Sequence, residues 1–181
     1  MPKKICIIYG FCEGPRIAAR MLTTLKNNGF EITGDPHNAD VILAHSGGCY
    51  MVPHNVAAKR IIMVGLTYWP GKSITRTFAK KIWDDLTHHR SERAARFWAH
   101  KTRWNLTYFW NMPRNFAMLN ALRAGDFWQL TRVTVVRNHQ DHFCTPDLTC
   151  LPFAHKPRLV ELPGQHDDLW LHPERYLSVI Q

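Results

Sequence analysis

Short, uninterrupted apolar runs are the feature that most constrains how this chain can fold. Lys4–Tyr9, Val41–Ala44 and Arg60–Leu66 are such runs. Two further strands are expected later in the chain, at the β-branched segment Thr131–Arg137 and at Pro157–Leu162. Strands that are apolar on both sides belong to parallel sheets whose two faces are covered by helices. We therefore expect an α/β fold with a small, mostly parallel sheet of about five or six strands flanked by helices.

The segments between these runs complete the pattern. Pro15–Asn28 shows apolar residues at helical spacing, and we expect a helix there. We also expect helices over Tyr50–Lys59, although Pro53 disturbs the first turn, and over Pro173–Ile180 at the end. Phe30–Asp40 is polar and rich in turn residues, so it is read as a connection.

The stretch Ser73–Gln129 differs from the rest of the chain. It contains no strand-like run and is rich in Trp and Arg. Helical spacing predicts helices over Ile74–His89, Ser91–Lys101 and Pro113–Ala124. Because the sheet pattern resumes at Thr131, we interpret 73–129 as a helical insertion within one domain.

Length and composition narrow the class of protein. The chain has 181 residues, of which 45% are hydrophobic and 20% charged, which suits a single globular domain over residues 1–181. No apolar run approaches the roughly 20 residues that span a bilayer. Met1–Lys4 is basic but is not followed by a secretion signal. The expectation is a cytoplasmic protein with no membrane partner.

Cysteine and histidine patterns give no reason to expect a metal or cofactor. The five cysteines include no C-x-x-C pair, and the 11 histidines form no H-E-x-x-H motif. Cys49 is read as a small buried residue and not as a nucleophile. The expectation is an activity that uses only side chains and backbone.

The basic charge has two interpretations. The net charge is +9, which is compatible with a nucleic-acid partner but also with solubility alone. Trp and Arg in 73–129 resemble a stacking surface for single strands. Tryptophans at helical spacing more often pack one helix on another, with Arg covering the outer face. We therefore expect no nucleic-acid partner, and the sequence leaves the oligomeric state open.

The motif Ala44-His45-Ser46-Gly47-Gly48 ends the second apolar run. A serine between small residues on a tight turn after a strand can adopt a strained backbone and expose its hydroxyl at the carboxyl edge of the sheet. Ligands of open α/β sheets bind at that edge. The motif resembles the G-x-S-x-G nucleophile elbow of the α/β-hydrolase family, with alanine in place of the first glycine.

The resemblance extends to the order of the other catalytic residues. In this family the nucleophile is followed by an acid after a late strand and a histidine after the last strand. The sequence has Asp141 and His166 in those places. The resemblance implies Ser46 as nucleophile, His166 as base and Asp141 as the carboxylate that orients the base. Asp147 is the alternative acid.

The resemblance also implies an oxyanion hole and a substrate pocket. Its backbone donors would be Gly47 and Phe11, with Cys12 as the alternative to Phe11. The family often has His-Gly before this loop, where this chain has Tyr-Gly. An insertion at 73–129 would form a cap over the active site, with aromatic residues lining an apolar pocket. We expect these to be Trp69, Trp110 and Trp128.

The expected activity is hydrolysis of small carboxylic esters, including lactones or thioesters, through an acyl-enzyme. The alternative is a catalytically degenerate member of the family that binds a ligand or protein.

Overall fold

The computed structural model describes residues 2–10, 13–68, 112–141 and 147–181. The helices expected over Ile74–His89 and Ser91–Lys101 lie outside the described residues. The predicted cap insertion therefore stays a prediction for most of its length.

One parallel sheet forms the centre of the protein, in the order β2-β1-β3-β4-β5-β6, and every neighbouring pair is parallel. The predicted α/β class and the size of the sheet are confirmed. The strands are β1 (Lys3–Ile8), β2 (Phe30–Thr33), β3 (Val41–His45), β4 (Arg60–Val64), β5 (Val133–Asn138) and β6 (Arg158–Leu162).

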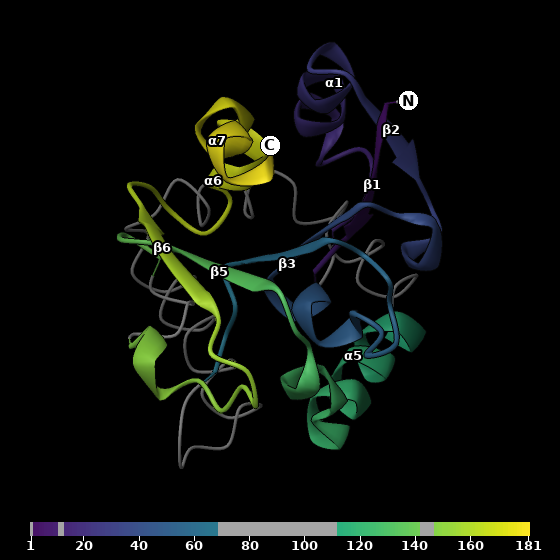
Figure 1. Cartoon of the computed structure of the whole chain (residues 1–181). Helices are drawn as coiled ribbons and strands as arrows, with labels where there is room; N and C mark the ends of the chain where they lie inside the picture. Colours follow the sequence, from purple (N-terminus) through teal and green to yellow (C-terminus); the bar gives the residue numbers. More distant parts are fainter. Residues whose placement is uncertain (1, 11–12, 69–111, 142–146) are drawn as a thin grey trace.

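Helices cover both faces of the sheet (Figure 1). One face carries α1 (Ala19–Asn27), α6 (Asp168–Leu171), the 3-10 turn η5 (Pro173–Tyr176) and α7 (Leu177–Ile180). The other carries the 3-10 turn η2 (Ser46–Met51), α5 (Met112–Ala124), η3 (Asp126–Gln129) and η4 (Leu148–Cys150). A short turn, η1 (Pro36–Asn38), precedes β3.

Alternate residues of each strand supply the two hydrophobic cores. In β3, Val41 and Leu43 face α1, whereas Ile42 and Ala44 face η2 and α5. Side chains of successive strand residues point to opposite faces, so a strand buried on both sides needs an unbroken apolar run. Burial of each such large side chain stabilises the fold by about 1.5–3 kcal/mol.

The chain changes direction across the sheet beside β1. It runs from β1 outward to the edge strand β2, then crosses back to β3 on the other side of β1. The segments after β1 and β3 therefore pack on opposite faces of the sheet. In open α/β sheets, ligands bind at the carboxyl ends of strands where the chain changes direction in this way.

Three sequence expectations need correction. The segment read as a polar connection contains the edge strand β2 (Phe30–Thr33). The helix expected over Tyr50–Lys59 is wrong, because only η2 forms there and it ends at Met51, before Pro53. The first helix begins at Ala19 and not at Pro15.

Two other helix expectations are confirmed. The helix expected over Pro113–Ala124 is α5, where Met118 is fully buried and Ala121 and Leu122 pack against the second core. The segment Pro173–Ile180 is helical, with η5 as its first turn and α7 as its second.

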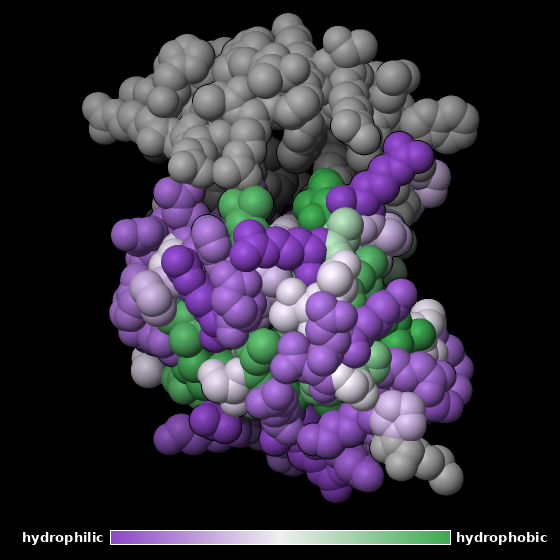
Figure 2. Space-filling model, turned by 90° about the horizontal axis from the view of Figure 1, so that it is seen from above, coloured by the Kyte–Doolittle hydropathy of each residue, from purple (hydrophilic) through white to green (hydrophobic). Residues whose placement is uncertain are grey.

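The surface view in Figure 2 shows mainly hydrophilic side chains, with apolar ones in small separate patches. Within the described part of the chain, no helix is both long enough and apolar enough to cross a lipid bilayer.

Candidate active site

The turn after β3 places Ser46 at the carboxyl edge of the sheet. His45 is extended, with φ of −125°, and Ser46 then adopts a left-handed φ of 51°. This conformation costs an L-residue other than glycine about 1–2 kcal/mol, so the surrounding packing must hold it. A Cβ at Gly48 would lie 2.5 Å from the Ile8 carbonyl oxygen, so only glycine lets the turn pass so close to β1.

The loop after β1 lies directly against this turn. A Cβ at Gly10 would lie 2.9 Å from the Ser46 Cβ and 2.9 Å from the His45 carbonyl oxygen. Glycine at this position therefore allows the first loop to touch the serine turn. The two loops that meet here follow β1 and β3, the neighbouring strands at which the chain changes direction across the sheet.

His166 and Asp141 form a buried pair at the same edge. His166 Nδ1 lies 2.6 Å from Asp141 Oδ2, and both side chains are almost fully buried. Asp141 follows β5 in a turn closed by its backbone N–H, which donates to the Asn138 carbonyl. The Asn138 amide donates to the Gln165 carbonyl over 2.6 Å, which holds the loop that carries His166.

Strand register brings this pair next to Ser46. His45 in β3 is opposite Val64 in β4, so the next residues, Ser46 and Gly65, leave the sheet side by side. A Cβ at Gly65 would lie 3.1 Å from His166 Cε1 and 3.4 Å from Asp141 Oδ2. Gly65 also has a positive φ of 65°. The histidine–aspartate pair therefore packs on the strand end beside the serine.

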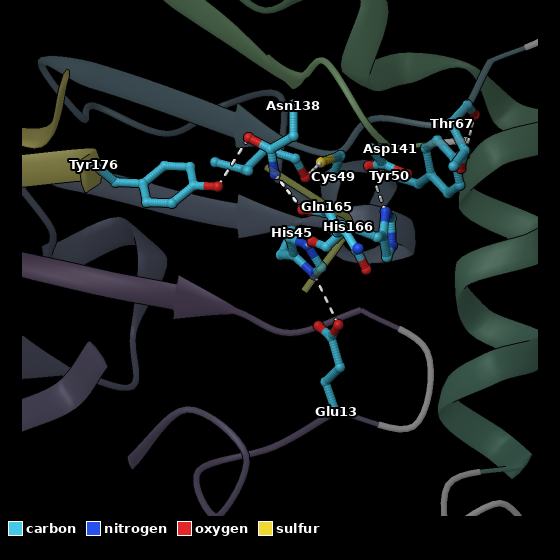
Figure 3. A network of polar contacts seen from close by, with 11 residues as sticks. Glu13, His45, Cys49, Tyr50, Thr67, Asn138, Asp141, Gln165, His166 and Tyr176 are labelled. Atoms are coloured by element: carbon cyan, nitrogen blue, oxygen red, sulfur yellow. Dashed lines mark hydrogen bonds and ion pairs between the residues drawn. The ribbon is translucent and has the colours of Figure 1, made fainter. Parts of the chain in front are cut away.

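A second buried histidine–carboxylate pair lies behind the serine turn. His45 Nδ1 is 2.7 Å from Glu13 Oε1, and His45 Nε2 is 2.9 Å from the His166 carbonyl oxygen. The other Glu13 oxygen accepts a hydrogen bond from the Gly10 N–H over 2.6 Å. Figure 3 shows the His45 ring between the Glu13 carboxylate and the backbone of His166.

The two members of this second pair shift each other's protonation. Burial alone would raise the pKa of the Glu13 carboxyl, but the charge and hydrogen bond of His45 outweigh it and bring the pKa below its usual value. Burial alone would lower the pKa of His45, but the charge and hydrogen bond of Glu13 raise it above its usual value. Both shifts favour the charged forms.

The remaining predicted residues fall in different places. Gly47 is buried in the first turn of η2. Asp147 is exposed, and its carboxylate caps η4 by accepting the Thr149 N–H over 2.8 Å. Phe11, Cys12, Trp69 and Trp110 lie outside the described residues. Cys49 is fully buried in the second core, as expected.

Trp128 belongs to an aromatic cluster on the α5 side of the sheet. Its ring centroid is 4.2 Å from that of Phe127, 4.7 Å from that of Phe153 and 5.1 Å from that of Tyr68. Trp128 is half-buried in this cluster. Its packing role is therefore described, and a substrate role for it stays a prediction.

Sequence reasoning missed Glu13, Gly65 and Asn138. Each lies at the carboxyl end of a strand or just after it, the same signal that indicated Ser46, Asp141 and His166. Among the residues that the structure describes, no group of three or more His, Cys, Asp or Glu side chains is arranged to hold a metal ion.

Comparisons with known proteins support the fold through structure and not through sequence. No family model matches the sequence, and no curated protein matches it. An enol-lactonase from Burkholderia xenovorans superposes with a TM-score of 0.64 at 14% identity, covering 99% of this chain and 90% of the lactonase. A hydrolase from Pseudomonas aeruginosa gives 0.60 at 14% identity, with 99% and 88% covered.

A structure from a study of carboxylesterases of Nitrososphaera gargenis gives a TM-score of 0.53 at 13% identity, covering 98% of this chain and 88% of that one. At such identities the likeness concerns the arrangement of the backbone. The chain has the fold of the α/β-hydrolase superfamily.

Proposed function

We propose that this protein is a serine hydrolase that cleaves small carboxylic esters, including lactones or thioesters, through an acyl-enzyme on Ser46. One observation carries the proposal. A buried histidine–aspartate pair packs against the strand end beside a serine whose backbone is held in a left-handed turn. An activated serine needs a base that a carboxylate orients, and this pair supports that role for His166 and Asp141.

In the proposed reaction, the Ser46 hydroxyl oxygen attacks the ester carbonyl carbon while Nε2 of His166 takes the hydroxyl proton. Asp141 accepts the hydrogen bond from Nδ1, which fixes the ring tautomer and stabilises the imidazolium that forms. The tetrahedral intermediate collapses, and the proton passes to the leaving alcohol oxygen. Water then attacks the acyl-enzyme by the same route and releases the acid.

The negative oxygen of the intermediate needs donors that are already in place. Gly47 lies in the first turn of η2, where backbone N–H groups have no carbonyl partner within the helix. We assign its N–H to the oxyanion hole, with the Phe11 N–H as the second donor. Loss of one such donor typically raises the barrier by about 2.7–4 kcal/mol.

The substrate class rests on the reaction and on the solved structures of similar fold. Those structures include proteins described as an enol-lactonase, carboxylesterases and a thioesterase domain, and all three names refer to acyl transfer to water. We assign the cap role to residues 73–129 and the wall of an apolar acyl pocket to Trp69, Trp110 and Trp128.

The test is covalent labelling by a fluorophosphonate reagent, read by intact mass. We expect one adduct on the wild type and none on Ser46→Ala, because only an activated serine displaces the fluoride. Ser178→Ala is the matched control, since Ser178 is exposed on α7 and its loss should leave labelling unchanged.

A folded wild type that takes up no adduct and hydrolyses no ester in a panel would reject the proposed function. The degenerate, ligand-binding form of the fold would then be the better interpretation. Adduct formation that persists in Ser46→Ala would reject the assignment of the nucleophile.

A further inference from the structure

We propose that the buried Glu13–His45 pair is a positioning element that fixes the loop carrying His166 against the turn carrying Ser46. The inference rests on the proposed function, because it assigns these residues a role in placing the proposed base. It assigns neither residue a step in the bond-making chemistry.

The contacts join three separate strand ends. Glu13 follows β1 and binds the Gly10 N–H of its own loop over 2.6 Å. His45 is the last residue of β3 and bonds Glu13 on one side and the His166 carbonyl on the other, over 2.7 Å and 2.9 Å. A single side chain thus connects the first loop, the serine turn and the loop after β6.

The hydrogen-bond partners define the protons on the His45 ring. A backbone carbonyl can only accept, so Nε2 must carry a hydrogen to bond His166. With Glu13 ionised, Nδ1 must also carry a hydrogen, and the ring is then an imidazolium. A neutral ring would keep both contacts only if Glu13 carried the proton. The pKa of Glu13 is lowered and that of His45 is raised, which favours the charged pair.

The surroundings of the ring support the same charge state. Among the described residues, the titratable groups that face it are Glu13 from the loop after β1, and Asp167 and His166 from the loop after β6. Trp170 of α6 packs edge-on with ring centroids 5.1 Å apart and carries no charge. Two carboxylates therefore face a fully buried cation.

The positive charge on His45 strengthens its hydrogen bond to the His166 carbonyl. A hydrogen bond from a protonated ring to a carbonyl is about twice as strong as a neutral one. The His166 carbonyl is held by a ring that cannot turn without losing its bond to Glu13. The two histidine rings lie only 4.8 Å apart between centroids, so a shift of this contact would displace the His166 ring itself.

The test uses nuclear magnetic resonance of 15N-labelled whole protein, which needs no turnover. In the wild type at pH 7, we expect both His45 ring nitrogens to show the chemical shifts of protonated nitrogens. We also expect the His166 Nδ1 proton, shared with Asp141, to give a far-downfield resonance. Spectra of His45→Gln assign the first set of signals.

Glu13→Gln removes the carboxylate charge with little change in volume. We expect the doubly protonated His45 signature to disappear and the His166 Nδ1 proton to broaden or vanish. Turnover should fall by about 10- to 100-fold in kcat, with KM changed much less, because the base is misplaced and not removed. His45→Gln, whose amide can still donate to the His166 carbonyl, should retain more activity than His45→Leu.

The matched control is Glu174→Gln. Glu174 is also paired with a histidine and an arginine, but on the surface, so its loss should change neither the downfield proton nor kcat.

Two outcomes overturn the inference. One is a neutral His45 ring in the folded wild type. The other is a folded Glu13→Gln variant that keeps both the His166 proton resonance and the wild-type kcat. If the wild type neither hydrolyses esters nor takes up the fluorophosphonate, the proposed function fails, while the resonance measurements still decide whether the pair fixes the His166 loop.

Discussion

Two buried histidine–carboxylate pairs lie side by side at the carboxyl edge of this sheet, and they differ in what the second ring nitrogen does. His166 bonds Asp141 through Nδ1 over 2.6 Å, and His45 bonds Glu13 through Nδ1 over 2.7 Å. The Nε2 of His45 donates to a backbone carbonyl. The Nε2 of His166 is the atom to which the proposed reaction assigns proton transfer.

This difference gives the two pairs different proposed roles. We call Glu13–His45 the holding pair, and His166–Asp141, to which the proposed reaction assigns proton transfer, the reactive pair. A histidine whose two nitrogens both donate within the fold must stay protonated, so it cannot accept a proton during a reaction. A histidine with one nitrogen oriented by a carboxylate keeps the other as a base. Similar distances and similar burial therefore do not imply equal roles, and the partner of the second nitrogen distinguishes the two histidines.

The sharpest way to break the comparison is to neutralise the acid of the reactive pair. Asp141→Asn should lower kcat by about 10⁴-fold, because the amide favours the wrong tautomer of His166. Asp147→Asn is the control, since that exposed carboxylate caps η4 and accepts both the Thr149 N–H and the Thr149 hydroxyl. Steady-state hydrolysis of an activated ester measures both. If Asp147→Asn had the larger effect, the acid would have to be reassigned.

The pH dependence of folding should distinguish the holding pair by its sign. Glu13 has a lowered folded pKa, so its contribution to stability is present above its usual pKa of 4.5 and is lost as pH falls through the folded value. His45 has a raised folded pKa, so its contribution is complete below its usual 6.5 and is lost as pH rises through the folded value.

The pair should therefore stabilise the wild type most between pH 4.5 and 6.5. In that window we expect Glu13→Gln to lower the unfolding free energy by about 1.5–3 kcal/mol, because His45 gives up its proton and the charge-assisted hydrogen bond of the pair is lost. Urea denaturation of both proteins from acid to mild alkali measures the difference. A difference that grows steadily toward alkaline pH would contradict the charged pair.

Gly65→Ala tests whether the reactive pair needs the space at the end of β4. The added Cβ would lie 3.1 Å from His166 Cε1, and the left-handed φ of 65° adds strain. We expect a loss of about 1–2 kcal/mol in stability and about 10- to 100-fold in kcat. Gly29→Ala is the matched control, because Gly29 also has a left-handed φ, of 81°. A Cβ there would meet no other part of the described chain within 4 Å. This variant should lose stability and keep full activity.

The smallest effect should come from the uncharged hydrogen bonds that hold the loop carrying His166. The Tyr176 hydroxyl donates to the Asn138 side-chain oxygen, whose amide holds the Gln165 carbonyl. Tyr176→Phe removes this donor from the Asn138 side-chain oxygen and should lower the unfolding free energy by about 1–2 kcal/mol. We expect kcat to change only a few-fold, as measured with the same ester. A loss as large as that of Asp141→Asn would mean that the loop depends on these hydrogen bonds more than on His45.

The strands that could be predicted most directly from the sequence are those buried on both faces of the sheet. β3 and β4 bury apolar residues on both faces, so their runs are continuous and easily recognised. β5 was recognised by its three valines. The edge strand β2 alternates apolar with polar residues and was read as a connection. The helix expected after Tyr50 failed because its apolar residues fill the second core through a 3-10 turn that ends before Pro53.

The candidate site was only partly accessible from sequence. Ser46, Asp141 and His166 could be proposed from the sequence because their order and their positions after strands match a known pattern. Glu13 and His45 are 32 positions apart, and they meet only because β3 pairs with β1. Strand order does not follow from local propensity, so their pairing could not be predicted. The conformation of Gly65 depends equally on the packing of His166 above it.

Because all six strands are parallel, their amino ends lie together on the side of the sheet away from the serine turn. This side has no part in the chemistry proposed above. Lys59 lies on that side, directly before the amino end of β4, and its side chain is 82% exposed. Attachment of the protein to a solid support through an amine at this point should orient the serine turn away from the support. Immobilised protein of this kind should retain the reactivity of the free chain, whereas random coupling would block a fraction of the sites.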